Sequence, residues 1–148
     1  MIVLDTNVVS EMMRKVPSPA VLAWLDEQPA SSLFLTAVSE AEIRFGLALL
    51  PGGGHRESLV RAADRIFREI LAGRILPFDS EAAGAFAVIA AERRRAGRPI
   101  SQFDCQIAAI ARSRGARVAT RNAGDFEGCG VEIIDPWRAR PGPRRHPR

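Results

Sequence analysis

The chain has 148 residues, of which 47% are hydrophobic and 26% charged, values that fit one globular domain and exclude a fibrous or disordered chain. No apolar run approaches the roughly 20 residues of a membrane span, and no basic segment precedes the first apolar stretch, so we expect neither a membrane anchor nor a signal peptide. The net charge of +4 is concentrated in residues 138–148, which contain five arginines and no acidic residue; residues 1–137 carry 16 basic and 17 acidic side chains and are nearly neutral.

Apolar periodicity, broken by proline and glycine, divides the chain into strands and helices. In chain order, we predict a strand at residues 2–4, helices at 8–15 and 19–28, a strand at 32–36, helices at 39–50 and 57–72, a strand at 74–78, helices at 80–97 and 104–114, and strands at 117–120 and 131–134.

Strands that alternate with helices require crossover connections, which produce a parallel sheet with helices on both faces. We therefore expect an α/β protein with a three-layer α/β/α arrangement around a central, mostly parallel sheet of five strands. We expect residues 1–137 to form this one domain and residues 138–148 to form a disordered tail that either adds phosphate affinity or is a plain extension. Cys105 and Cys129 lack metal-binding spacing, which indicates reduced thiols in a cytoplasmic protein.

Two acidic residues follow predicted strands. Asp5 comes directly after the apolar stretch 2–4, and Asp125 lies in a short polar segment after the strand at 117–120. Ligands of open α/β sheets bind at the carboxyl ends of the strands. Burying the carboxylate of Asp5 at that edge costs free energy unless a positive group lies beside it. Asp125, taken alone, has a simpler explanation, because an aspartate often stabilises a turn.

Two further acidic residues lie on apolar helix faces. Glu42 is spaced i−4, i+3 and i+7 from Val38, Phe45 and Leu49, which predicts that it points inward with them. Asp104 is followed at three, four and seven positions by Ile107, Ala108 and Ala111, so it is also predicted to lie on the packed face of its helix. Each has a structural alternative, because Ser39 and Glu42 match a helix-capping box and Asp104 suits a helix N-terminus.

Taken together, the four carboxylates are harder to explain structurally, because strand ends and helix starts meet at one edge of such a sheet. We expect Asp5, Glu42, Asp104 and Asp125 to lie within a few ångströms of one another. Unneutralised, they would repel and raise one another's pKa. Mg²⁺ or Mn²⁺, which bind oxygen ligands and bridge to phosphate, would relieve this repulsion, and no His or Cys cluster indicates zinc.

Four segments carry a resemblance to a known family. Residues 3–11, 39–46, 100–110 and 119–126 are similar, in the same order, to motifs of the PIN-domain ribonucleases, and within them of the VapC-type toxins of type II toxin–antitoxin systems, in particular the FitB-like branch. No single motif is specific, but the four together are, and they cover nearly all of residues 1–137.

The resemblance implies an Mg²⁺- or Mn²⁺-dependent endoribonuclease that hydrolyses RNA with a metal-activated water. It also implies a small antitoxin partner that covers the active-site groove, and a homodimer. The implied catalytic and metal-binding residues are Asp5, Glu42, Asp104 and Asp125, and the implied supporting polar residues are Thr6, Asn7, Thr120 and Asn122.

Other function classes fit less well. A haloacid-dehalogenase phosphatase needs a second aspartate where Asn7 stands, and a response-receiver domain needs a lysine near the last strands. The three glycines at 52–54 lack the Lys-Ser/Thr sequel of a phosphate-binding loop. Two alternatives remain open: a housekeeping RNA-processing nuclease of the same fold, and a catalytically inert nucleic-acid-binding module.

Overall fold

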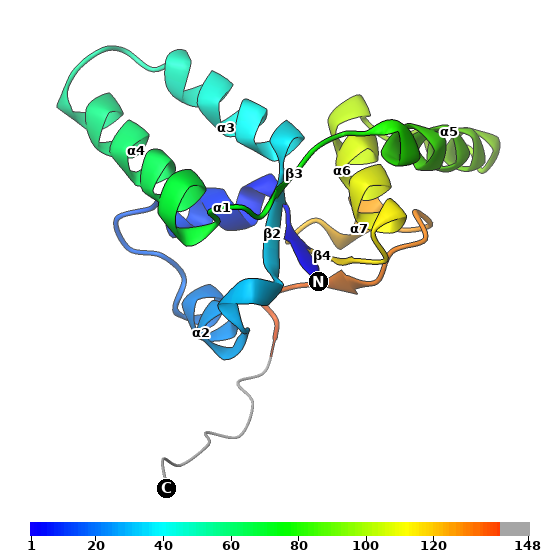
Figure 1. The fold of residues 1–148 in the computed structure, drawn as a ribbon, viewed down its shortest axis with the longest axis horizontal. Coiled ribbons are helices and arrows are strands. Elements are labelled where there is room, and N and C mark those ends of the chain that lie inside the picture. Colours follow the sequence, from blue (N-terminus) through cyan, green and yellow to red (C-terminus); the bar gives the residue numbers. More distant parts are fainter. Residues whose placement is uncertain (140–148) are drawn as a thin grey trace, which may run out of the picture.

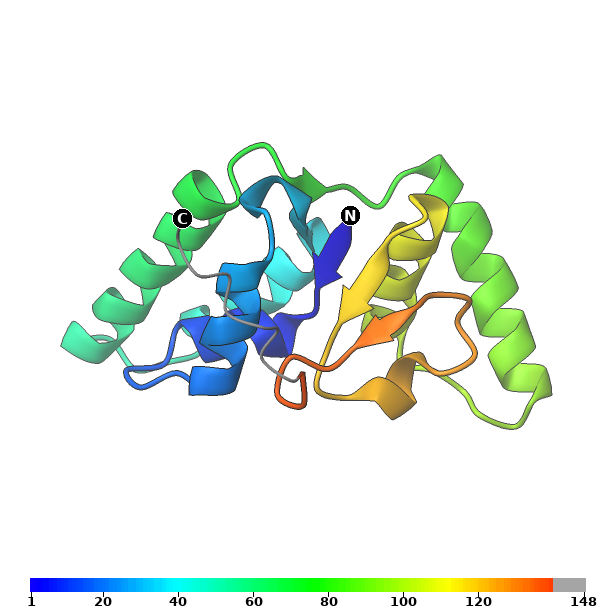
Figure 2. The ribbon, with the colours of Figure 1, turned by 90° about the horizontal axis from the view of Figure 1, so that it is seen from below.

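The computed structural model describes residues 1–139, which form a parallel sheet of five strands with helices on both faces, as predicted. Figure 1 shows the sheet between the two groups of helices, and Figure 2 shows the same layers from below. The sheet order is β3-β2-β1-β4-β5. The strands are β1 (Ile2–Leu4), β2 (Leu33–Thr36), β3 (Ile75–Leu76), β4 (Arg117–Ala119) and β5 (Ile133–Ile134). The helices are α1 (Thr6–Met12), α2 (Pro19–Glu27), α3 (Ala37–Ala48), α4 (Gly54–Arg65), α5 (Ser80–Arg95), α6 (Gln102–Ser113) and α7 (Ala123–Phe126), with short turns η1 (Ala30–Ser32) and η2 (Ile66–Ile70).

The central strand β1 has alternate side chains in two separate cores. Ile2 and Leu4 pack with α1, α2 and η2 on one face, whereas Val3 packs with α5 and α6 on the other. All three side chains are fully buried, which explains why this strand is a continuous apolar run rather than an alternating one. The sheet is therefore sealed on both faces, and ligands have access at its ends.

One edge of the sheet collects the chain segments that follow the strands. Because all the strand pairs are parallel, the carboxyl ends of β1, β2 and β4 lie at the same edge. Helix α6 leads into β4 and runs back along the sheet, so its N-terminus lies at this edge as well. This topology brings residues 5, 36, 104 and 120 together, although up to 115 positions separate them in sequence.

Several predicted boundaries were wrong by a few residues. Helix α3 begins at Ala37 rather than Ser39, because Thr36 at the end of β2 is its N-cap and accepts a hydrogen bond from the Ser39 N–H at 3.0 Å. The capping-box explanation of Ser39 and Glu42 is thereby excluded. The helix predicted at 57–72 is α4 followed by the π-helical turn η2, and the strand predicted at 74–78 shortens to Ile75–Leu76.

The described chain ends just after the last strand. Arg138 and Ala139 form a turn in which both backbone N–H groups donate to the Asp135 carbonyl. The rest of the predicted disordered tail at 138–148 lies outside the described residues. Within residues 1–139, no helix combines the length and the apolar character needed to cross a bilayer.

Candidate active site at the carboxyl edge of the sheet

Asp5 is fixed by three hydrogen bonds as it leaves β1. Its Oδ1 accepts from the Thr6 backbone N–H at 2.8 Å, and its Oδ2 accepts from Asn7 Nδ2 at 3.1 Å and from Thr120 Oγ1 at 2.8 Å. The side chain is 6% exposed. Burial raises the pKa of Asp5, and the charges of Asp104 and Asp125 raise it further, against the lowering effect of the Thr120 hydroxyl. The carboxylate therefore has a single orientation and an excess of negative surroundings.

The predicted polar neighbours connect β1 to β4. Thr120, fully buried, also accepts hydrogen bonds from Asn7 Nδ2 at 3.2 Å and from the Asn122 backbone N–H at 3.0 Å. The Thr6 hydroxyl is different: it is buried and has no hydrogen-bond partner among residues 1–139. A buried hydroxyl without a partner costs free energy, so this atom is available to a ligand of the site.

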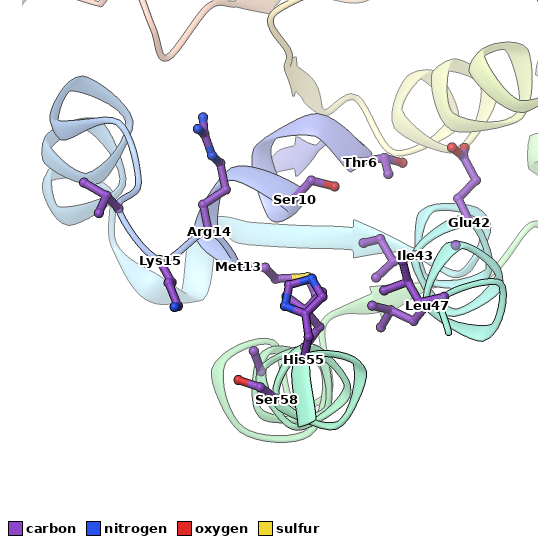
Figure 3. A pocket seen from close by; sticks show the side chains of 15 residues that line it. Thr6, Ser10, Met13, Arg14, Lys15, Glu42, Ile43, Leu47, His55 and Ser58 are labelled. Atoms are coloured by element: carbon purple, nitrogen blue, oxygen red, sulfur yellow. The ribbon is translucent and has the colours of Figure 1, made fainter. Parts of the chain in front are cut away.

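Glu42 borders the site from α3, but the reason given for its inward orientation was wrong. Phe45 and Leu49, predicted to share its buried face, are 67% and 69% exposed; Ile43 and Ser39 form the buried face instead. Glu42 lies at the margin of that face, half-buried, with its carboxylate toward Thr6 (Figure 3). Burial raises its pKa, with the charges of Asp5 and Asp104 adding to the effect.

Asp104 and Asp125 approach from the other side of the sheet edge. Asp104 lies in the first turn of α6, where its backbone N–H donates to Ser101, the helix N-cap, at 3.2 Å. As predicted, the residues three, four and seven positions later are buried. Burial raises the pKa of Asp104, and the charge of Asp125 raises it further. Asp125 belongs to the short helix α7, rather than the predicted turn, and is exposed.

The structure brings all four predicted carboxylates to one cavity of about 570 Å³. The cavity is bordered by Asp5, Thr6, Asn7, Ser10, Glu11, Arg14, Glu42, Asp104, Arg121, Asn122, Asp125 and Trp137. No His or Cys of the described chain borders it, so the hydroxyls of Thr6 and Ser10 lack the His partner of the usual nucleophile–base pairs there. Burial raises the pKa of the nearby Cys105 thiol to about 11, so it is protonated and inert at neutral pH.

The carboxylates are less tightly gathered than predicted. In residues 1–139, no three His, Cys, Asp or Glu side chains are close enough to hold a metal ion between them. This arrangement does not fit a closed protein cage, but it does fit Mg²⁺, which commonly takes one or two carboxylates and keeps several water ligands. The all-oxygen donor set and the unpartnered Thr6 hydroxyl agree with such an ion.

Five cavity residues were not predicted as part of the site: Ser10, Glu11, Arg14, Arg121 and Trp137. Glu11 differs from the other acids because structural contacts already satisfy it. The Ser18 backbone N–H, which donates to it at 2.8 Å, lowers the pKa of Glu11, as does the neighbouring Arg14 at 3.3 Å. The one available signal was place in a family-like segment: Ser10 and Glu11 lie in segment 3–11, and Arg121 lies in segment 119–126. Arg14 and Trp137 have no local pattern that indicates a site.

A second, more apolar groove of about 770 Å³ adjoins the acidic cavity. Figure 3 shows Met13 beside α1, Ile43 and Leu47 on α3, and His55 and Ser58 on α4 around this space. Four residues border both hollows: Thr6, Ser10, Arg14 and Glu42. The groove and the acidic cavity thus adjoin along these four residues.

Comparison with known proteins identifies the family. The PIN domain family model matches residues 2–127. The chain is 44% identical over 137 residues to VapC ribonuclease Y4jK of Sinorhizobium fredii, a match that covers 93% of this chain and 98% of that relative. This chain belongs to the PIN-domain family and is a VapC-type toxin homologue. A similar relationship holds to Toxin FitB of Neisseria gonorrhoeae, at 39% identity over 137 residues, covering 93% of this chain and 99% of FitB.

Solved VapC-family structures share the fold. A structure of FitAB bound to the IR36 DNA fragment matches with a TM-score of 0.88 and 38% identity, over 95% of this chain and 98% of that chain. FitAcB from Neisseria gonorrhoeae matches with a TM-score of 0.83 and 39% identity, over 94% of this chain and 100% of that chain. The three-layer PIN architecture and the assignment to the FitB-like branch are confirmed; the roles of the individual site residues stay predictions.

Proposed function

We propose that this chain is the toxin of a toxin–antitoxin pair and an endoribonuclease that requires Mg²⁺ or Mn²⁺ to hydrolyse RNA phosphodiester bonds. The observation that carries the proposal is the gathering of four carboxylates, from four distant chain segments, around one cavity at the sheet edge. Three of them have pKa values raised by burial and by one another's charge. The similarity to a relative named as a VapC ribonuclease supports RNA as the substrate.

Each group of cavity residues has a distinct role in the proposed reaction. Asp5, held by Thr6, Asn7 and Thr120, supplies a fixed anionic oxygen pair, while Glu42, Asp104 and Asp125 add negative charge around it. When bound, a divalent ion would polarise the scissile phosphate and lower the pKa of the attacking water. The unpartnered Thr6 hydroxyl can donate to a water or a phosphate oxygen in the cavity. In this proposal water is the nucleophile: among the described residues the cavity has no Cys, and no His to activate the hydroxyl of Ser10 or Thr6.

The direct test incubates the purified chain with total cellular RNA and maps the new RNA ends by sequencing. We expect discrete ends with Mg²⁺ or Mn²⁺ and none with excess EDTA. Equal cleavage in EDTA would overturn the metal requirement. Absence of both cleavage and metal-dependent stabilisation would favour the inert nucleic-acid-binding module. Growth arrest on expression, relieved by the product of a short neighbouring reading frame, separates a toxin from a housekeeping nuclease.

We further propose that one antitoxin segment occupies the apolar groove and reaches into the acidic cavity. The two hollows adjoin, so apolar side chains of one segment can fill the groove while a basic side chain meets the carboxylates. The similarity to the toxin in the FitAB complex supports a protein partner of this kind. A homodimer and a cytoplasmic location stay predictions; light scattering of the purified chain tests the first.

Leu59→Ser is expected to weaken antitoxin binding about tenfold to a hundredfold, because it removes an aliphatic side chain from the groove wall. Val60→Ser is the matched control: Val60 is the next residue of α4, equally half-buried, and borders a different hollow near Gly53. Titration calorimetry with the cognate antitoxin measures both affinities, and thermal unfolding checks that both variants fold. Equal losses in the two variants would show that the groove is not the docking site.

A further inference from the structure

The mouth of the acidic cavity has an arginine that forms no ion pair within the described chain. Arg121 follows β4, is exposed, and borders the cavity. Within residues 1–139, its guanidinium makes no salt bridge. Arg14, the other arginine at this cavity, is paired with Glu11 at 3.3 Å. The charge of Arg121 helps to lower the pKa of Glu11, but without a direct pair its guanidinium N–H groups stay open to a ligand.

An aromatic ring holds the Arg121 side chain in place. The guanidinium carbon lies 5.1 Å from the centre of the Trp137 ring, within the range of a cation–π contact. Trp137 is itself fixed, because its backbone N–H donates to Asp135 Oδ1 at 2.9 Å and its ring packs against the core beneath α1 and α2. Packing against a ring occupies a face of the guanidinium and leaves the N–H groups at its edge free to donate.

The backbone of Arg121 is tied to the carboxylate centre. Its N–H donates to Asn7 Oδ1 at 3.4 Å, and Asn7 Nδ2 donates to Asp5 Oδ2 at 3.1 Å. One side chain, Asn7, thus links the backbone of Arg121 to the carboxylate of Asp5. This placement suits a residue that must hold a ligand group at a constant distance from the reacting centre.

Electrostatics explains why such a cation is needed. An RNA strand brings one negative charge per nucleotide to a cavity that already has five carboxylates on its border. A divalent ion would neutralise the scissile phosphate, but the flanking phosphates would still meet this negative field. We propose that Arg121, held against Trp137, binds a phosphate adjacent to the scissile one and so positions the RNA strand. This inference rests on the proposed ribonuclease function.

RNA fits this position better than the antitoxin does. Arg121 and Trp137 border the acidic cavity and do not border the apolar groove, whereas Arg14 borders both. The basic side chain proposed for the antitoxin enters from the groove, on the side of Arg14 and Glu42. A cation placed directly at Arg121 would be repelled by it, whereas a phosphate is attracted to it. The planar guanidinium also matches two phosphate oxygens at once, which a lysine cannot do.

The test measures RNA binding in the Asp104→Asn background, where cleavage is expected to be blocked, by fluorescence anisotropy of a labelled single-stranded RNA with Mg²⁺ at several salt concentrations. Adding Arg121→Gln is expected to weaken binding about tenfold at low salt and to reduce the slope of log affinity against log salt by about 0.7, the contribution of one single-strand phosphate contact. Arg117→Gln, at the opposite end of β4, is the control for loss of charge alone and should change neither.

Two further variants test the role of the ring. Arg121→Lys should restore the salt slope but not the full affinity, because an ammonium is a point charge. Trp137→Phe should bind RNA nearly as tightly as the parent. Trp137→Leu keeps an apolar side chain but removes the ring, so it should lose most of the RNA affinity that Arg121→Gln loses. Thermal unfolding verifies that both variants fold. In the cleavage-competent chain, Arg121→Gln should raise KM about tenfold with kcat nearly unchanged.

The outcomes separate this inference from the proposed function. RNA binding and cleavage that are normal in the Arg121→Gln variant would overturn the inference and leave the nuclease function standing. An equal loss in Arg117→Gln would also overturn it, since the effect would then be one of net charge. A loss of antitoxin affinity without a loss of RNA affinity would assign Arg121 to the protein partner instead. A parent that neither binds nor cleaves RNA would overturn the proposed function itself.

Discussion

Asp104→Asn is expected to lower the rate of RNA cleavage by at least about a hundredfold while leaving the chain folded and slightly more stable. The substitution keeps the shape of the side chain and removes one negative charge from the cavity. The helix start is preserved, because the hydrogen bond to Ser101 at this position comes from the backbone N–H. Stability should rise at neutral pH because burial and the charge of Asp125 hold the pKa of Asp104 above its usual value. Initial cleavage rates and thermal unfolding in EDTA measure the two effects.

Glu40→Gln is the matched control for this experiment. Glu40 lies on α3 two residues from Glu42 but forms a surface ion pair with Arg44 at 2.7 Å and does not border the cavity. Its loss should leave cleavage unchanged and alter stability little. Asp5→Asn should abolish cleavage too, but it also replaces an acceptor of three hydrogen bonds, so its stability is expected to fall. Normal cleavage by Asp104→Asn would remove this residue from the reaction.

The sheet and its functional edge were predictable because their signals are local. Helices cover both faces of β1, so each of residues 2–4 is buried and apolar. The resulting continuous apolar run makes the strand recognisable in the sequence. Parallel connections then determine that everything following a strand lies at one edge. Asp5 and Asp104 could therefore be assigned to this edge, because Asp5 directly follows β1 and Asp104 lies in the first turn of α6.

Glu42 shows where periodicity fails. The spacing that grouped it with Phe45 and Leu49 is a real helical spacing, but α3 buries a narrower face, centred on Ile43, and leaves those two residues in solvent. Hydrophobic spacing does not indicate how much of a helix its neighbours cover. Glu42 borders the cavity because α3 starts directly at the end of β2, a consequence of Thr36 capping the helix.

The cavity mouth could not be predicted, because its contacts join parts of the chain that have no common pattern. Arg121 contacts Trp137 across 16 residues and Asn7 across 114. Glu11 accepts a hydrogen bond from the Ser18 backbone N–H, which belongs to the loop that follows α1. Such contacts depend on the final position of loops, to which neither strand alternation nor helix periodicity applies.

Divalent metal is expected to stabilise the chain strongly near neutral pH and hardly at all near pH 4. Asp5, Glu42 and Asp104 all have folded-state pKa values raised above 3.8 or 4.5, their ordinary values. As pH rises from those values, the three groups lose their protons in the unfolded chain before they do so in the folded chain. The stability that they provide below about pH 4 is therefore lost as pH rises through their folded pKa values. Mg²⁺ or Mn²⁺ binds the ionised form, so it can offset this loss only where the carboxylates are charged.

At a metal concentration about 100 times the dissociation constant, the stabilisation is about 2.7 kcal/mol, which corresponds to a rise in Tm of about 10 °C for a domain of this size. Thermal unfolding in EDTA and in Mn²⁺, at both pH values, measures it. The double variant Asp5→Asn/Asp104→Asn should melt at the same temperature with and without metal, whereas Glu40→Gln should respond as the wild type does. An equal metal effect at both pH values, or one that survives in the double variant, would place the ion elsewhere on the protein. Because this readout requires no substrate, it tests the metal site even if the RNA target is never found.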